Sequence, residues 1–368
     1  MQPAEESVEQ MKAVFMDGVE KIEVRDAPVP EPGPGEALLK VHSCAVCGSD
    51  IKIFRHGNKR LQYPVIVGHE ISGEIVTAGE NVEAVAVGDR VAVGADVPAV
   101  WNQNVPGGDS FIDYATGHEF DGGFAHFMLL NQRMLEFGPV SHIPDSLGYD
   151  AACLAEPLAC AVKGLEFGQF GRGKSIAVIG LGPIGCMILE LAKAYGASRI
   201  FGIQRSRRRL EAAKKLAPEA RFICTTDEHP VETVLSETGG RGVDMVVTTS
   251  GSVQAHKDAI QMVAHLGYVN LFGGLRGEPE LCIDSNIIHY KECFVMGTHG
   301  SDPRHHKEAV RLLSTGAVHG QWYVSETFPL ARISDAYAFH EAHGGMKAVV
   351  HPWDTVESAG SHRGGRRE

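Results

Sequence analysis

The stretch SIAVIGLGPIGCMILELAKAYG, residues 175–196, constrains the fold of this chain more than any other part of the sequence. An apolar run leads into glycines spaced Gly-x-Gly-x-x-Gly, and a helical pattern follows directly. In such a turn the first glycine permits a tight bend, the second lets a pyrophosphate approach the backbone, and the third lets helix and strand pack closely. The helix N-terminus favours anions. We therefore predict a dinucleotide site at Gly180, Gly182, Pro183, Ile184 and Gly185, with a strand-to-helix turn that holds no ligand as the alternative.

The second half of the chain alternates strand-like and helical patterns. Six apolar runs, SIAVIG, RIFGIQ, RFICTT, MVVTTS, YVNLFG and CFVMGTH, are separated by helical stretches between residues 158 and 302. This alternation predicts an α/β fold with a doubly wound parallel sheet. Ser250, which ends the fourth run, and Thr298, within the sixth, are further candidate contacts of the cofactor.

The first half has a different texture. The runs MKAVFM, KIEVRD, EALLKVH, SGEIVTAG and GDRVAVG are short, β-like and separated by turn residues. They predict a β-rich, barrel-like domain over residues 11–157. The closing piece, residues 303–352, is assigned back to that domain. We expect residues 1–10 and 355–368 to be disordered tails.

Composition excludes several classes of function. A chain of 368 residues, 43% of them apolar, is long enough for two domains. Its formal charge of −12 argues against nucleic-acid or membrane-surface binding and favours small-molecule chemistry. The acidic start is unlike a signal peptide, and no apolar run approaches the roughly 20 residues of a membrane span. We therefore expect a cytoplasmic protein whose eight cysteines stay reduced.

The end of the second strand-like run bears on which dinucleotide is bound. An Asp or Glu about 20 residues after the glycine turn normally holds the adenosine ribose and repels a 2′-phosphate. This chain has Gln204 there, followed by Arg205, Ser206 and Arg207 to Arg209. Arginines at a helix start oppose its dipole unless an anion compensates. We predict a preference for NADP(H), with Arg205 and Arg209 at the 2′-phosphate. A solvated basic surface with NAD use is the alternative.

Candidate metal ligands occur at three places in the sequence. Cys47 lies in VHSCAVCGSD, His69 and Glu70 lie in YPVIVGHEISGEIV, and Glu156 lies in ACLAEPLACAV. Together they offer one sulfur, one nitrogen and two carboxylates. The Cys-x-x-Cys spacing of Cys44 and Cys47 leaves three interpretations: half a zinc knuckle, a redox pair, or one ligand beside a bystander. We favour the last, because the chain has no second Cys-x-x-Cys and this one lies in β-rich sequence.

Five motifs, Cys-Gly-Ser-Asp (47–50), Gly-His-Glu (68–70), Gly-Asp-Arg-Val (88–91), Glu-Pro-Leu (156–158) and the glycine turn, give residues 11–352 a resemblance to a known family. The chain resembles the zinc-dependent medium-chain dehydrogenase/reductase family, especially its sorbitol, polyol and threonine dehydrogenase members. The resemblance implies a GroES-like catalytic domain joined to a Rossmann domain.

The resemblance also implies one catalytic zinc, held by Cys47, His69 and either Glu70 or Glu156, with a fourth position open to water or a substrate oxygen. Many members bind a second, structural zinc through four cysteines, but no cysteine occurs between Cys47 and Cys153 here. We therefore expect no structural zinc. Which glutamate is the direct ligand stays open, and Glu70 is also a catalytic candidate because it alternates with water in the family.

The reaction that the resemblance implies is hydride transfer between a nicotinamide and a secondary alcohol or ketone of a polyol, sugar or cyclitol. Ser49 matches the hydroxyl that passes the proton. Lys52 stands where many relatives have the outer histidine of this relay, so it is either the relay end or an uninvolved surface lysine. The alternatives are an NAD-dependent L-threonine-type dehydrogenase and an inactive nucleotide-binding relative. Family members commonly form homodimers or homotetramers.

A second Gly-His-Glu, residues 117–119, lies in a region without the family pattern. We expect His118 and Glu119 to belong to a solvated loop rather than to bind metal. Trp101, Asn102 and Asn104 are candidates to line a polar substrate pocket.

Overall fold

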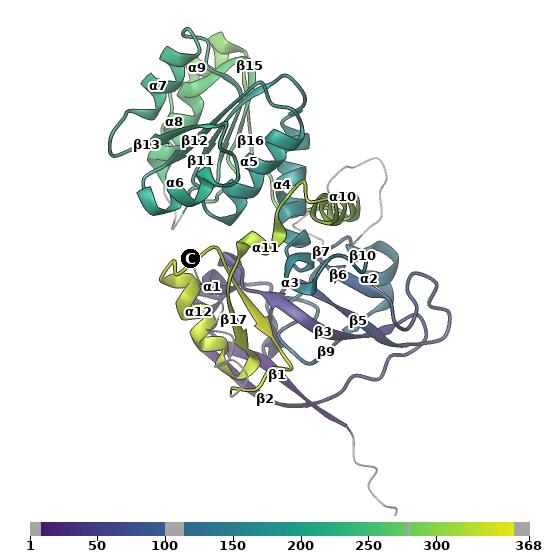
Figure 1. Ribbon diagram of the computed structural model, residues 1–368. Coiled ribbons are helices and arrows are strands. Elements are labelled where there is room, and N and C mark those ends of the chain that lie inside the picture. Colours follow the sequence, from purple (N-terminus) through teal and green to yellow (C-terminus); the bar gives the residue numbers. More distant parts are fainter. Residues whose placement is uncertain (1–8, 100–113, 276, 278–279, 357–368) are drawn as a thin grey trace, which may run out of the picture. The chain divides into compact units, whose positions relative to one another are not determined.

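The computed structural model describes residues 9–99, 114–275, 277 and 280–356, and these form two compact units (Figure 1). The first unit comprises residues 1–159 and 301–368, and the second comprises residues 160–300. The chain passes from one unit to the other within helix α4 (Ala155–Phe167). The domain boundaries expected from the sequence, after residues 157 and 302, lie within two residues of this division.

The first unit is built on β-sheets, as its sequence texture predicts. A three-stranded sheet has the order β2-β1-β4, and a larger sheet has the order β10-β6-β5-β3-β18-β17, with β9 paired to β3. The strands are β1 (Gln10–Gly18), β2 (Lys21–Pro28), β3 (Ala37–Ala45), β4 (Val65–Ile66), β5 (Glu70–Ala78), β6 (Arg90–Val93), β7 (Asp96–Val97), β8 (Tyr114–Ala115), β9 (Phe127–Leu130), β10 (Val140–His142), β17 (Val324–Pro329) and β18 (Lys347–His351). Gln10 begins a strand, so the expectation of a tail over residues 1–10 is wrong at Gln10, and residues 1–8 lie outside the described residues.

The end of the chain completes the larger sheet. Strand β18 pairs antiparallel with β3, with Val349 opposite Ala45 and Val350 opposite Cys44. This pairing brings β18 to the segment that leads into helix α1 (Gly48–His56). The other helices of this unit are α2 (Gln132–Phe137), α3 (Tyr149–Ala152), α10 (Pro303–Ser314), α11 (Gly320–Tyr323) and α12 (Ile333–Glu341), with a 3₁₀ turn, η1 (Leu330–Arg332).

The second unit is a parallel α/β sheet, which confirms the predicted fold class. Its six strands have the order β13-β12-β11-β14-β15-β16, with helices on both faces (Figure 1). The strands are β11 (Ser175–Ile179), β12 (Arg199–Gln204), β13 (Arg221–Cys224), β14 (Val243–Thr248), β15 (Val263–Asn270) and β16 (Phe294–Met296). The helices that follow α4 are α5 (Pro183–Ala194), α6 (Arg207–Lys214), α7 (Pro230–Glu237), α8 (Val253–Met262) and α9 (Ser285–Lys291). The strand order reverses between β11 and β14, the place where such sheets bind ligands.

Within the described ranges, no helix combines the length and the apolar character needed to cross a membrane. All eight cysteines are free.

Candidate metal centre and cofactor site

Three of the predicted metal ligands meet in the first unit. Cys47 is the N-cap of α1, and His69 directly precedes Glu70, the first residue of β5. The donor atoms of these three side chains, a sulfur, a nitrogen and a carboxylate oxygen, all lie within 4.8 Å of one another. His69 and Glu70 are buried and Cys47 is half-buried. Such a compact, mixed donor set is what zinc takes in sites that keep a position open for substrate.

Asp50 contacts two members of this donor set, Cys47 and His69, and its sequence pattern did not indicate this role. Its Oδ2 accepts a hydrogen bond of 2.9 Å from the N–H of Cys47, and its Oδ1 lies 3.2 Å from Nδ1 of His69. Burial raises the pKa of Asp50, but His69 and the N–H of Cys47 more than offset this and lower it below its ordinary value. Burial likewise opposes a charge on His69, and Asp50 raises the pKa of His69 well above its ordinary value. A carboxylate on the far nitrogen is how proteins orient metal-binding histidines.

Glu70 is held by a second residue that sequence reasoning missed. Lys347, on β18, forms an ion pair with both carboxylate oxygens of Glu70, and its Nζ lies 2.6 Å from Oε2. Nζ also lies 3.3 Å from the carbonyl oxygen of Val46, to which it donates. Burial opposes the charge on Lys347, but Glu70 overrides it and raises the pKa of Lys347. Lys347 thus competes with a cation for Glu70.

Glu156, the second candidate carboxylate, lies in the first turn of α4 and is 6% exposed. It is not a member of the group formed by Cys47, His69 and Glu70. Burial raises the pKa of Glu156 to about 7, with His69 opposing the rise and Glu70 adding to it. Glu156 is therefore close enough to His69 and Glu70 for their charges to shift its pKa.

The two candidate relay residues differ in their surroundings. Ser49, in the first turn of α1, places its Oγ 3.2 Å from Nε2 of His69. Lys52 is exposed on the same helix and contacts none of the described residues through a hydrogen bond or ion pair. The structure thus places Ser49 at the donor set and does not connect Lys52 to it.

Cys44 belongs to the core. It lies in β3, is fully buried, and packs among apolar side chains, and burial raises the pKa of its thiol well above the ordinary value. A β-carbon on Gly68 would come within 2.9 Å of its sulfur. This environment agrees with the interpretation of Cys44 as a small apolar bystander.

His118 and Glu119 lie in a turn and outside the metal-ligand group, but they are half-buried rather than fully solvated. Glu119 accepts two hydrogen bonds from Arg60, at 2.7 and 3.1 Å, and a third from the N–H of Ala115 at 2.9 Å. The ring of His118 lies 6.2 Å from the ring of His69, centroid to centroid. Burial, and then His69, lower the pKa of His118. Trp101, Asn102 and Asn104, the suggested pocket residues, lie outside the described residues.

The glycine turn of the second unit has the geometry that its sequence predicts. Gly180 has φ +94°, and a β-carbon there would meet Oγ1 of Thr249 at 2.7 Å. A β-carbon on Gly185 would meet the carbonyl oxygen of Gly180 at 1.9 Å, so helix α5 packs too closely on the turn for any side chain. Gly182 is the N-cap of α5, with Pro183 in the first turn, and the space around it is open. An anion can approach the backbone there.

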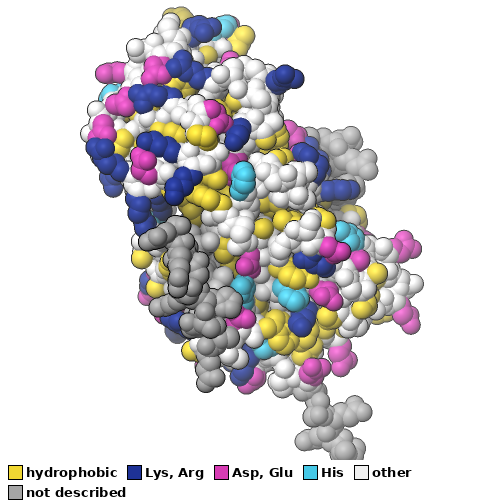
Figure 2. Space-filling view, in the orientation of Figure 1, with side chains coloured by type: hydrophobic (Ala, Val, Ile, Leu, Met, Phe, Trp, Pro, Cys, Tyr) yellow, Lys and Arg dark blue, Asp and Glu magenta, His cyan; other side chains and the backbone are white. Residues whose placement is uncertain are grey.

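The residues at the end of β12 surround this turn. Gln204 accepts a hydrogen bond of 3.1 Å from the N–H of Leu181, so it braces the turn. Arg209 is half-buried, and its Nη1 would lie 3.9 Å from a β-carbon on Gly182. Burial, and then Arg208, lower the pKa of Arg209. Arg205 is exposed. Figure 2 shows Lys and Arg side chains gathered over the region where Figure 1 places α6.

The two remaining cofactor candidates also follow strands of the parallel sheet. Ser250 comes shortly after β14, and its carbonyl oxygen lies 3.1 Å from Nε2 of His256. The same nitrogen lies 2.9 Å from the carbonyl oxygen of Gly273. Thr298 follows β16 and accepts a 3.0 Å hydrogen bond from the side chain of Asn270. All of these residues lie at the carboxyl edge of the sheet, as the glycine turn does.

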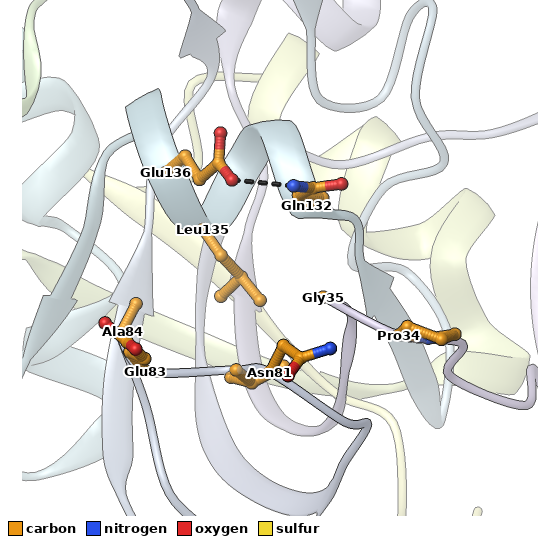
Figure 3. Close-up of a pocket in the computed structure, with 9 residues that line it drawn as sticks. Pro34, Gly35, Asn81, Glu83, Ala84, Gln132, Leu135 and Glu136 are labelled. Carbon is orange, nitrogen blue, oxygen red and sulfur yellow. Dashed lines mark hydrogen bonds between the residues drawn. The ribbon is translucent and has the colours of Figure 1, made fainter.

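A pocket of 650 Å³ elsewhere in the first unit is not part of this chemistry. It lies between α2 and the turns before β3 and after β5, and Gln132 donates a 2.7 Å hydrogen bond to Glu136 at its rim (Figure 3). None of the metal-ligand candidates lines it.

A β-rich unit with a buried sulfur, imidazole and carboxylate cluster, in one chain with a dinucleotide-type parallel sheet, defines a metal-dependent nicotinamide oxidoreductase. Comparisons with known proteins agree. Residues 33–142 match the family model of the alcohol dehydrogenase GroES-like domain, and residues 183–315 match the model described as zinc-binding dehydrogenase. The chain belongs to the zinc-dependent medium-chain dehydrogenase/reductase family, in its polyol and threonine dehydrogenase branch, and is an oxidoreductase.

Individual relatives cover nearly the whole chain. The sorbitol dehydrogenase of Bacillus subtilis (strain 168) is 30% identical over 351 residues, which span 93% of this chain and 97% of the relative. The L-threonine 3-dehydrogenase of Pyrococcus abyssi is 33% identical over 303 residues, spanning 81% of this chain and 84% of the relative. A zinc-binding dehydrogenase structure from Sinorhizobium meliloti 1021, bound to NADP, is 28% identical with a TM-score of 0.84, covering 94% of this chain and 100% of that chain.

Proposed function

We propose that this chain is a dehydrogenase with one catalytic zinc and no structural zinc. It moves hydride between NADP(H) and a secondary alcohol or ketone of a polyol, sugar or cyclitol. The observation that carries the proposal is the meeting of Cys47, His69 and Glu70 within 4.8 Å, backed by Asp50.

Each residue that would hold the metal has a distinct role. Cys47 and His69 supply the sulfur and nitrogen ligands, and Asp50 fixes the orientation of His69. The carboxylate ligand would be Glu70 or Glu156: Glu70 lies in the cluster and is ion-paired with Lys347, and Glu156 is buried outside the cluster. Bound at this site, zinc supplies a Lewis acid that polarises the substrate oxygen and favours loss of its proton near neutral pH.

The chain's own residues then handle the proton. In the oxidative direction the C–H bond of the carbinol carbon breaks and its electron pair moves with the hydrogen to C4 of the nicotinamide, while the hydroxyl proton leaves through Ser49. The Oγ of Ser49, 3.2 Å from Nε2 of His69, is within reach of a group at the donor set. We keep Lys52, exposed on the same helix, as the outer end of this relay. A pH–rate profile that Lys52→Met leaves unchanged would remove Lys52 from the relay.

The cofactor proposal rests on the end of β12. There is no acidic side chain at position 204 to repel a 2′-phosphate, and Arg209 reaches over the glycine turn. The structural relative from Sinorhizobium meliloti binds NADP. We expect wild type to favour NADPH over NADH in kcat/KM, and Gln204→Asp to reverse that preference. An unchanged preference for NADH in both proteins would overturn the cofactor assignment and leave the metal assignment standing.

The substrate proposal rests on the relatives. The sorbitol dehydrogenase acts, by its name, on a polyol, and this chain matches it along almost its full length. We expect purified protein with bound zinc to reduce ketoses or keto-sugars with NADPH, and to lose this activity on chelation or in Cys47→Ala. Activity that survives both treatments would disprove the proposal.

An L-threonine dehydrogenase is the second candidate function, because the Pyrococcus abyssi enzyme is 33% identical. The two are separated by assaying oxidation of L-threonine and of sorbitol with NAD and NADP. Oxidation of L-threonine alone would replace the polyol assignment.

We also propose a homodimer or homotetramer, paired along the free edge of β16. Phe294 on this edge strand is 50% exposed, and its ring stacks on Tyr268 at 4.8 Å. Leu266 and Tyr290 nearby are 55% and 76% exposed. We propose that a second copy of this chain packs on these exposed side chains, since the edge strand of a sheet can pair with a strand of another chain. Light scattering should give a mass that is a multiple of 39.6 kDa, and Phe294→Lys should lower that mass.

We propose a cytoplasmic location, which suits the acidic composition and the free cysteines. Cell fractionation tests this location.

A further inference from the structure

We propose that His118 is a specificity-determining residue that hydrogen-bonds the substrate group on the carbon next to the reacting carbinol carbon. The inference rests on the proposed function and deepens it. A hydrogen bond with His118 would select substrates with two neighbouring polar groups, such as vicinal diols and α-hydroxy ketones.

The position of His118 is the first support. Its ring centroid lies 6.2 Å from that of His69, and the two planes are inclined at 52°. It is not one of the three clustered metal-ligand candidates. His118 is half-buried, so part of the ring remains accessible. The ring therefore lies beside the donor set without belonging to it.

The turn that carries His118 is fixed to the segment that carries His69. Gly117 has φ +75°, and a β-carbon there would come within 3.1 Å of the backbone of Gly68. A β-carbon on Gly122 would meet the carbonyl oxygen of Gly68 at 2.2 Å. The N–H of Gly123 also donates a 2.9 Å hydrogen bond to that oxygen. The two imidazole rings are thus mounted on backbones that contact each other directly.

Further contacts hold the turn itself. The N–H groups of His118, Glu119 and Phe120 all point to the carbonyl oxygen of Ala115, at 3.1 to 3.2 Å. Glu119 pairs with Arg60 through two hydrogen bonds. A side chain on such a braced turn keeps its place when substrate arrives, which is the property a specificity residue needs.

The hydrogen bonding of the ring indicates what it offers. Nδ1 lies 3.3 Å from the carbonyl oxygen of Thr116, and a carbonyl oxygen only accepts, so Nδ1 carries the hydrogen in this contact. Nε2 makes no hydrogen bond with any residue that the structure describes. In the neutral ring Nε2 is an acceptor. It therefore suits a substrate hydroxyl or amine that donates.

The test compares two ketones that differ only in the neighbouring hydroxyl. Acetoin and 2-butanone are reduced by wild type, His118→Leu and His118→Gln, each with its zinc content measured. We expect His118→Leu to raise KM for acetoin about three- to tenfold, with kcat/KM for 2-butanone changed less than twofold, the size of one neutral hydrogen bond. His118→Gln, which keeps an acceptor, should recover part of the loss. His142→Ala, at an exposed histidine on β10, is the control and should change neither ketone.

The outcomes separate this inference from the proposed function. Equal losses on both ketones, or a fall in zinc content, would make His118 a structural or metal-binding residue and overturn the inference alone. Unchanged kinetics in His118→Leu would do the same. A wild-type protein that holds no zinc and reduces neither ketone nor any keto-sugar would overturn the proposed function and this inference together.

Discussion

Lys347 and Glu70 form an ion pair from which water is almost fully excluded, with the two side chains 4% and 0% exposed. Nζ of Lys347 lies 2.6 Å from Oε2 of Glu70. Each charge depends on the other, because an isolated ion of either sign is expensive to bury. The pair therefore fixes the charge balance around the predicted metal ligands.

Removing one partner should be much more harmful than removing both. We expect Lys347→Met to lower the free energy of unfolding by about 3–5 kcal/mol, because it leaves Glu70 charged and uncompensated. The double variant Lys347→Met with Glu70→Leu should recover a large part of this loss. Urea unfolding measures both effects. Arg332→Ala, which breaks an exposed pair with Asp335, should cost less than about 1 kcal/mol and serves as the control. Additive losses in the double variant would show that the two residues do not depend on each other.

Asp50 should control metal affinity without being a ligand. Asp50→Asn keeps the size of the side chain but removes the charge beside Nδ1 of His69. We expect zinc affinity, measured by competition with a chelating dye, to fall about 10- to 100-fold. Asp89→Asn, at a half-buried carboxylate that pairs with His142, is the matched control. Equal zinc affinity in Asp50→Asn and wild type would contradict the orienting role.

The glycine turn allows two substitutions with different consequences. Gly185→Ala would place a β-carbon 1.9 Å from the carbonyl oxygen of Gly180, so we expect both the melting temperature and the affinity for dinucleotide to fall. Gly182→Ala meets no protein atom closer than 3.9 Å, so it should leave the melting temperature nearly unchanged while still weakening dinucleotide binding. Thermal unfolding and fluorescence titration with NADPH measure the two properties. Unimpaired binding in Gly182→Ala would place the phosphates elsewhere.

His306 should make the protein less stable in mild acid. It is fully buried on α10 with Nδ1 2.9 Å from Oγ of Ser141, and burial lowers its pKa from 6.5 to about 3. Between these values the unfolded chain binds a proton that the folded chain does not, so stability falls as pH falls below about 6.5.

His306→Gln removes this dependence, because an amide does not titrate. From pH 7.5 to 5.5, wild type should lose about 1.4 kcal/mol of unfolding free energy relative to His306→Gln. A wild-type-to-variant difference that stays constant over this range would show that folding does not lower the pKa of His306.

The parts of the structure that depend on local sequence were predictable. Every strand-like run of the second half became a strand of the parallel sheet, because buried parallel strands are short, apolar and bounded by turns. The glycine turn was predictable because its glycine spacing, between an apolar run and a helical pattern, is also a local feature of the sequence. Cys47, His69 and Glu70 were selected from motif and chemistry, and they do meet.

The parts of the structure that depend on contacts between distant residues could not be predicted from the sequence. Lys347 pairs with Glu70 across 277 residues, and nothing in its own neighbourhood marks it as a buried charge. His118 looked like a solvated residue because its turn is rich in Gly, Asp and Glu, and only its packing on Gly68 brings it to His69. Asp50 was closer to discovery, since an acid in the first turn of a helix caps the backbone.

The antiparallel pairing of β18 with β3 has a consequence for biosynthesis. The segment with Cys47, His69 and Glu70 leaves the ribosome first, and the cation that balances Glu70 is made 277 residues after that glutamate. Until then the nascent chain carries an acidic group that cannot be buried, so the first unit stays incomplete while the second is translated. Premature termination before residue 347 would thus yield a polypeptide whose second unit can fold but whose first unit cannot complete its metal-ligand cluster.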